Sequence, residues 1–184
     1  MTLLAIIILS VILLSLVIGA SYNSFVHRKN AMLYAYHGLE TMLQKRHDLL
    51  PKLAEVVQTS AYFEEQLLER TNQLMLAQKE IKSLPAPEMA RKENEIVRSM
   101  QQITKELSRD AGVRQHKSFM HLQRSIADAE EQIAAARRAY NASVMEYNNA
   151  IEMFPTAVFA TLLQYKPEKP IEIAVLDADY TVEN

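Results

Sequence analysis

The chain begins with a long apolar stretch, and no charged side chain occurs between Thr2 and Val26. Leucine, isoleucine, valine and alanine occupy nearly every position as far as Ile18. About 20 apolar residues in a helix cross a bilayer core of about 30 Å, and the few small residues in this stretch are tolerated in such spans. The pattern therefore predicts a single transmembrane anchor over residues 1–26.

Basic residues mark one end of this stretch. None precedes it, whereas Arg28 and Lys29 follow it directly. A cleaved signal peptide, cut near Ala20, is the alternative, but such peptides carry basic residues in front of a shorter apolar core. Because basic flanks stay on the cytoplasmic side, we expect a single-pass protein with its N-terminus outside and the rest of the chain in the cytoplasm.

Beyond the anchor, apolar residues recur at intervals of three, four or seven positions, which is the period of one face of an α-helix. Each of four such stripes has to bury its apolar face against the others. We therefore expect an all-α fold in which the anchor continues into an antiparallel bundle of about four long helices, over residues 27–160. An extended coiled coil and a homo-oligomer formed through leftover apolar surface are the alternatives. The four stripes are Met32, Tyr36, Leu39, Leu43, Leu50, Leu53 and Val57; Phe63, Leu67, Leu74, Ala77 and Ile81; Met89, Ile96, Met100, Ile103 and Leu107; and Leu122, Ile126, Ala129, Ile133, Ala136, Tyr140, Val144, Tyr147, Ile151 and Phe154.

Prolines mark the expected ends of these helices. Proline is absent between the anchor and Pro51, so the first helix is expected to run straight out of the membrane. Pro51 either kinks that helix or opens a new one. Pro85 and Pro87 are expected to break the helix between the second and third stripes. Residues 110–112, Asp-Ala-Gly, predict a turn, and Pro155 is expected to end the fourth helix.

The last part of the chain, residues 161–184, differs in character and is expected to be extended. A linker with proline and lysine comes first, and acidic residues close the chain. Residues 171–175 alternate weakly between apolar and polar and form a candidate short strand, which needs a partner. A partly disordered tail is one interpretation, and a segment that adds to the sheet edge of another protein is the other.

Composition excludes several classes of protein. The net charge of −2 argues against a dedicated nucleic-acid binder, because such proteins carry a basic surface. Three glycines are too few for a hairpin-rich or dinucleotide-binding fold. The absence of cysteine removes disulfides, thiolate catalysis and zinc–sulfur sites from consideration.

No constellation of residues indicates catalysis. The histidines lack the spacing of a zinc site, and none is preceded three residues earlier by the glutamate that a di-iron bundle requires. The sequence also lacks a glycine-rich phosphate loop and a nucleophile elbow. We therefore expect no catalytic residue, no metal and no cofactor.

Two polar clusters stand out. Residues 45–48 read Lys-Arg-His-Asp directly before the Leu-Leu-Pro sequence, where Arg46 and Asp48 are placed to bind other elements, with surface charge as the alternative. Residues 140–141 and 147–148 are two Tyr-Asn steps seven residues apart, and so repeat on the same helix faces. Asparagines at equivalent heptad positions favour hydrogen bonds across helices that fix their register, and a polar docking strip is the alternative.

These segments carry a resemblance to the LemA family. Residues 22–26, Tyr-Asn-Ser-Phe-Val, resemble the segment that leaves the membrane in that family, and residues 43–53 resemble its Arg-x-Asp-Leu-Ile-Pro-x-Leu stretch. Further matches run through the last long helix to Pro155. Phe63 stands where the family usually has histidine, and the tail after Pro155 departs from the expected short aromatic ending.

The resemblance implies architecture more than chemistry. LemA-like proteins are bacterial inner-membrane proteins with one N-terminal anchor and a bundle of long helices, and some are encoded beside a membrane metalloprotease of the HtpX type. The family supplies no catalytic residue to transfer. Our candidates for structural or docking roles are Asn23, Arg46, Asp48, Pro51, Tyr140, Asn141, Tyr147, Asn148 and Pro155.

Three functions are consistent with these features. The first is a non-enzymatic interaction or scaffold protein of the LemA type, which presents a helical surface to a membrane or cytoplasmic protein. The second is a membrane-organising protein that self-assembles on the bilayer. The third is an accessory factor of an HtpX-type protease. An enzyme whose site the sequence does not reveal is a further alternative. The expected location is the bacterial inner membrane, and the expected partners are the lipid bilayer, an unidentified protein and a second copy of the chain, without nucleic acid.

Overall fold

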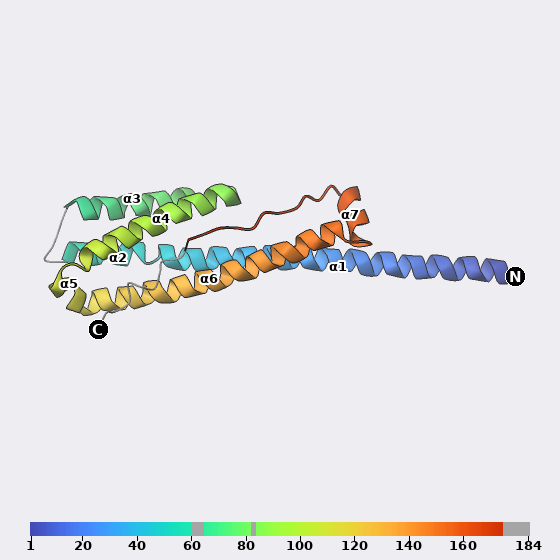
Figure 1. The fold of residues 1–184 in the computed structure, drawn as a ribbon, viewed down its shortest axis with the longest axis horizontal. Coiled ribbons are helices and arrows are strands. Elements are labelled where there is room, and N and C mark those ends of the chain that lie inside the picture. The colour runs from blue at the N-terminus through green and yellow to red at the C-terminus, as the bar shows by residue number, and fades with distance from the viewer. Residues whose placement is uncertain (60–64, 82–83, 175–184) are drawn as a thin grey trace. The chain divides into compact units, whose positions relative to one another are not determined.

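The structure, a computed structural model, describes residues 1–59, 65–81 and 84–174, and within these ranges it is all-α and contains no strand (Figure 1). The all-α prediction is therefore confirmed. Phe63 of the second stripe, and the tail from residue 175 onward, lie outside the described residues. The helices are α1 (Thr2–His47), α2 (Leu50–Thr59), α3 (Glu65–Ile81), α4 (Ala86–Leu107), α5 (Ala111–Gln115), α6 (Lys117–Glu152) and α7 (Thr156–Leu162).

The first helix, α1, is continuous from the apolar stretch into the amphipathic part of the chain, as expected. Its most apolar 18 residues have a mean hydropathy of 3.1, and none of them is buried. All of residues 1–20 are exposed. The N-terminal part of α1 is thus long and apolar enough to span a membrane.

The chain divides into two compact units, and α1 and α6 each contribute to both. Unit 1 contains residues 1–37 and 139–170. Unit 2 contains the described residues between 38 and 138, together with residues 171–174. Each unit has its own buried residues, so we describe them separately.

In unit 1, aromatic contacts pair α1 with the C-terminal part of α6. The Phe25 ring lies 5.9 Å from that of Tyr147, and the Tyr36 ring lies 5.6 Å from that of Tyr140, measured between ring centroids. Residue numbers rise along α1 as they fall along α6, so the two helices are antiparallel. Phe25 is fully buried, because Tyr165 of the following extended segment also contacts its ring at 5.0 Å.

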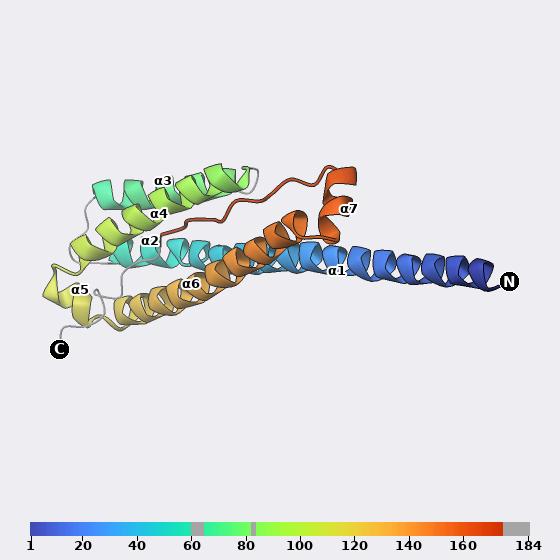
Figure 2. The same cartoon turned by 45° about the vertical axis from the view of Figure 1, so that its right-hand side comes forward.

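Unit 2 is a helical bundle built from α2, α3, α4, α5 and parts of α1 and α6. The apolar stripes of the sequence supply its core, in which Leu53, Met100 and Leu107 are among the fully buried side chains. Arg70, early in α3, pairs with Glu106 at the end of α4 at 3.2 Å, so these neighbours are antiparallel. Figures 1 and 2 both show α3 and α4 side by side.

Helix boundaries agree with expectation at two prolines and differ from it at one turn. Pro51 opens a new helix, α2, instead of kinking a continuous one. The expected turn at residues 110–112 begins one residue later as helix α5, because the Asp110 carboxylate accepts hydrogen bonds from the backbone N–H groups of Gly112 (2.7 Å) and Val113 (3.3 Å). Pro155 ends the fourth long helix as expected, but α7 follows it directly.

Candidate functional site

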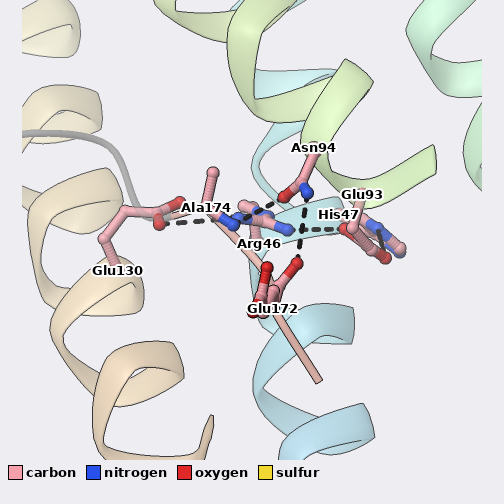
Figure 3. Close-up of polar contacts among 7 residues, drawn as sticks. All are labelled: Arg46, His47, Glu93, Asn94, Glu130, Glu172 and Ala174. Carbon is pink, nitrogen blue, oxygen red and sulfur yellow. Dashed lines mark hydrogen bonds and ion pairs between the residues drawn. The ribbon is translucent and has the colours of Figure 1, made fainter. Parts of the chain in front are cut away.

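Unit 2 contains a buried cluster of charged side chains at the end of α1. Arg46 is fully buried and pairs with Glu93 of α4 and with Glu130 of α6 (Figure 3). The distances from its Nη1 to the two Glu130 carboxylate oxygens are 3.3 and 3.4 Å. One guanidinium therefore joins three helices, and its several N–H donors allow it to bind two carboxylates at once.

His47 extends this cluster. Its Nε2 lies 2.9 Å from the Glu93 carboxylate, on the oxygen Oε1, while Arg46 takes the other oxygen of the same group. His47 and Glu130 are buried as well. With His47 neutral the four groups carry one positive and two negative charges, and with His47 protonated their charges balance.

The environment of Glu93 stabilises its ionised form. Burial raises the pKa of this carboxyl, but the hydrogen bond from His47 and the positive charge of Arg46 outweigh burial, and the pKa lies below its ordinary value of 4.5. The fold therefore holds Glu93 as a carboxylate. Removing a carboxylate or the cation would leave a buried charge without its partner, which is costly in a medium of low polarity.

The lowered pKa of Glu93 predicts how stability depends on pH. A lowered folded pKa contributes stability that is present above the unfolded value, near 4.5, and is lost as the pH falls through the folded value. We expect the free energy of unfolding of the native chain to fall more steeply below pH 4.5 than that of a Glu93→Gln variant, measured by chemical denaturation between pH 7 and pH 3. Parallel pH profiles for the two chains would contradict this prediction.

A second arrangement in unit 2 holds the tail against the helices. The Asn94 side-chain amide donates to the backbone carbonyl of Glu172 at 3.2 Å and accepts from the backbone N–H of Ala174 (Figure 3). The Arg137 guanidinium donates to the carbonyl of Ile173. Ile171 and Ile173 are buried, whereas the Glu172 side chain between them is exposed. The expected strand does not form within residues 171–174, because side chains rather than a neighbouring strand satisfy the backbone of this extended segment.

Unit 1 holds the preceding part of the tail in the same manner. The Asn148 amide donates to the carbonyl of Glu168 at 2.8 Å and accepts from the N–H of the same residue at 2.9 Å. The Tyr147 hydroxyl donates to the carbonyl of Lys166 at 3.2 Å. Burial, and then the negative charge of Glu168, raise the pKa of Tyr147, so its hydroxyl remains a donor. In both units an asparagine amide thus binds an extended backbone.

The predicted candidates near the end of α1 divide into buried and exposed residues. Arg46 belongs to the buried cluster, so surface charge is the wrong interpretation for it. Asp48 is exposed and accepts a hydrogen bond at 2.8 Å from the side chain of Gln44, which lies four residues earlier in the chain. Asn23 and Pro51 are exposed.

The Tyr-Asn repeat lies in unit 1. Tyr140 and Tyr147 are buried, and burial, followed by the charge of Glu168, raises the pKa of Tyr140 too. Asn148 was expected to bond across helices, but it bonds to the tail backbone; Asn141 is half-buried. Pro155 precedes α7 and follows a cis peptide bond.

Five residues of these arrangements were not among the predicted candidates, namely His47, Glu93, Asn94, Glu130 and Arg137. Glu93 and the adjacent Asn94, and Glu130 further on, lie far along the chain from Arg46. Glu93 had a signal in the sequence, since it stands between Met89 and Ile96, where the third apolar stripe skips a position. Glu130 had none, because the fourth stripe is uninterrupted around it. Asn94 had none, because its partners are backbone atoms.

A shallow groove of about 210 Å³ lies between α3 and α4. Arg70, Lys92 and Glu95 line it together with amide and apolar side chains, and Glu95 is paired with Lys92 at 3.5 Å and with Arg91 at 3.0 Å. Histidine is not among the lining residues, and the described part of the chain shows no group of three side chains placed to hold a metal ion.

The fold defines a class of protein, namely an all-α protein whose first helix is long and apolar enough to span a membrane. Compared with known protein families, residues 35–182 match the LemA family. The chain belongs to the LemA family, and this membership fits association with a membrane. The match runs through the tail, beyond the motifs that ended at Pro155. A comparison with curated proteins gave no match.

Proposed function

We propose that this chain is a membrane-anchored interaction or scaffold protein of the LemA type, without catalytic activity of its own. The observation that carries the proposal is the way in which unit 2 binds an extended segment. Asn94 and Arg137 bind its backbone, and Ile171 and Ile173 are buried against the unit. Many interaction modules bind their partners through a surface that recognises an extended peptide.

This binding mode suits segments from other proteins as well. Backbone hydrogen bonds provide affinity that is independent of side-chain identity, whereas pockets for alternate side chains provide selectivity. Burying an isoleucine side chain contributes about 1.5–3 kcal/mol. The favoured partner segment is therefore extended and carries branched apolar residues at every second position, like residues 171–173 of the tail.

The anchor places this surface at a membrane. The exposed apolar part of α1 is the proposed span, and Arg28 and Lys29 at its end favour a cytoplasmic location for the rest of the chain. The proposed location is the bacterial inner membrane, with a single pass and the N-terminus outside.

The proposal predicts that displacing the tail exposes a peptide-binding surface. In the full chain in lipid nanodiscs, Ile171→Asp with Ile173→Asp should release residues 171–174 from unit 2 and allow a labelled peptide of that sequence to bind there, measured by fluorescence anisotropy. Adding Asn94→Ala should weaken this binding about tenfold, because two hydrogen bonds of about 0.5–1.5 kcal/mol each are lost. Glu172→Gln is the matched control, since that side chain is exposed and the tail should stay bound.

Crosslinking in native membranes tests the same variants for a protein partner. A specific partner should be recovered more strongly when the tail is released and less strongly when Asn94→Ala is added. A second copy among the products would favour a self-assembling membrane-organising protein, and an HtpX-type protease would favour an accessory factor. Absence of peptide binding to every variant, together with the same bystanders from each, would contradict an interaction role for this surface.

A further inference from the structure

Unit 1 exposes a second apolar surface, separate from the apolar part of α1. Residues 153–163, which contain α7, carry no charged side chain. Phe154 is 84% exposed, Leu162 is 77% exposed and Met153 is 61% exposed, and Val158 and Leu163 are about half exposed. Several large apolar side chains exposed within one short segment indicate a binding or membrane-contact site.

The position of α7 along α1 shows what this surface meets. Phe159 of α7 packs edge-on against Tyr22, with ring centroids 5.8 Å apart. Tyr22 lies just after the exposed apolar residues 1–20 and just before Phe25, the first fully buried residue of the unit. Figures 1 and 2 show α7 beside α1 and running across its direction. The surface therefore lies at the level where the proposed span ends.

Basic residues follow this level along the chain. Arg28 and Lys29 follow on α1, within two turns of Tyr22, and Lys166 and Lys169 follow α7 in the same unit and are exposed. The Lys29 ammonium lies over the ring of Tyr165, 4.2 Å from its centroid. An apolar surface bordered by lysine and arginine is the arrangement that binds at the interface of a bilayer with anionic lipids.

We infer that residues 153–163 are a second membrane contact, with α7 lying in the interface between headgroups and acyl chains. The favoured occupant of this surface is lipid, because the surface lies beside the end of the apolar part of α1 and basic residues border it. The inference rests on the proposed function in one respect, that the N-terminal part of α1 spans the bilayer. It adds that unit 1 touches the membrane at two places rather than one.

The absence of tryptophan from the chain permits a direct test. Single tryptophans are introduced at exposed positions of the full chain: Met153→Trp and Leu162→Trp report on the surface, Leu9→Trp reports on the proposed span, and Met145→Trp is the matched control. Met145 is 62% exposed, almost the same as Met153, but lies eight residues earlier on α6, about 12 Å further along the helix. The proteins are placed in phosphatidylcholine–phosphatidylglycerol vesicles that carry bromine at a shallow or a deep position of the acyl chains.

We expect shallow bromines to quench the emission of Met153→Trp and Leu162→Trp by roughly half or more, because an interfacial helix buries its apolar face about 5–10 Å into the bilayer boundary. Deep bromines should quench Leu9→Trp, and neither lipid should quench Met145→Trp. Quenching at Leu9→Trp alone overturns the inference and leaves the anchor intact. No quenching at Leu9→Trp overturns the anchor itself. A blue-shifted but unquenched Leu162→Trp that depends on protein concentration overturns the inference in favour of a second copy.

Discussion

Replacing Arg46 with methionine is expected to lower the free energy of unfolding by about 3–5 kcal/mol, the cost typical of removing one partner from a buried ion pair. The side chain is fully buried, and its loss would leave the carboxylates of Glu93 and Glu130 facing each other without a cation. Methionine preserves much of the side-chain length, so the effect reports charge more than volume. Thermal unfolding followed by circular dichroism should show a midpoint lower by about 10 °C.

Arg70→Met is the matched control for this experiment. Arg70 also pairs with a glutamate on a neighbouring helix, Glu106 at 3.2 Å, but its side chain is half exposed. Exposed pairs contribute about 0–1 kcal/mol, so this variant should unfold close to the native chain. Adding Glu93→Gln and Glu130→Gln to Arg46→Met should recover part of the loss, because the buried negative charges are then gone. Equal destabilisation by Arg46→Met and Arg70→Met would contradict the role given to the cluster.

Protease access to the two sides of the membrane is expected to give an all-or-none result. With the N-terminus outside, protease added to spheroplasts should leave unit 2 uncut, whereas protease added to inverted vesicles should digest it. The reason is that Arg28 and Lys29 follow the span and no basic residue precedes it. Immunoblotting against the C-terminal residues measures the outcome.

A variant with reversed charge provides the control for orientation. Arg28→Gln and Lys29→Gln, combined with Thr2→Lys and Leu3→Lys, move the basic residues to the other end of the span. Protection should then appear in inverted vesicles and be lost in spheroplasts. Digestion of the native chain in spheroplasts would show that the predicted orientation is wrong.

The helices and much of their burial were predictable because they depend on local periodicity. The positions of the buried charges also lie within that periodicity. Arg46 stands between Leu43 and Leu50 of the first stripe, and Glu93 stands between Met89 and Ile96 of the third. Each is three or four residues from both neighbours, so each shares their face.

The pairing within the cluster was not predictable in the same way. Whether Arg46 meets Glu93 depends on the register of α1 against α4, which side chains throughout the core determine together. The partners of the two asparagines were not predictable either, because Asn94 and Asn148 bind backbone atoms of the tail, which every residue possesses. Helix α7 spans seven residues, which is too few for a helical period to be recognised.

The number of residues between Arg46 and its two partners determines when the cluster can form during synthesis. Glu93 and Glu130 follow Arg46 by 47 and 84 residues. At the usual 5–20 residues per second, the ribosome needs about 4–17 s after making Arg46 to reach Glu130. Throughout that interval Arg46 lacks at least one of its two carboxylate partners. Stable closure of the core around Arg46 therefore has to wait for α6, by which time the apolar start of α1 has long since left the ribosome.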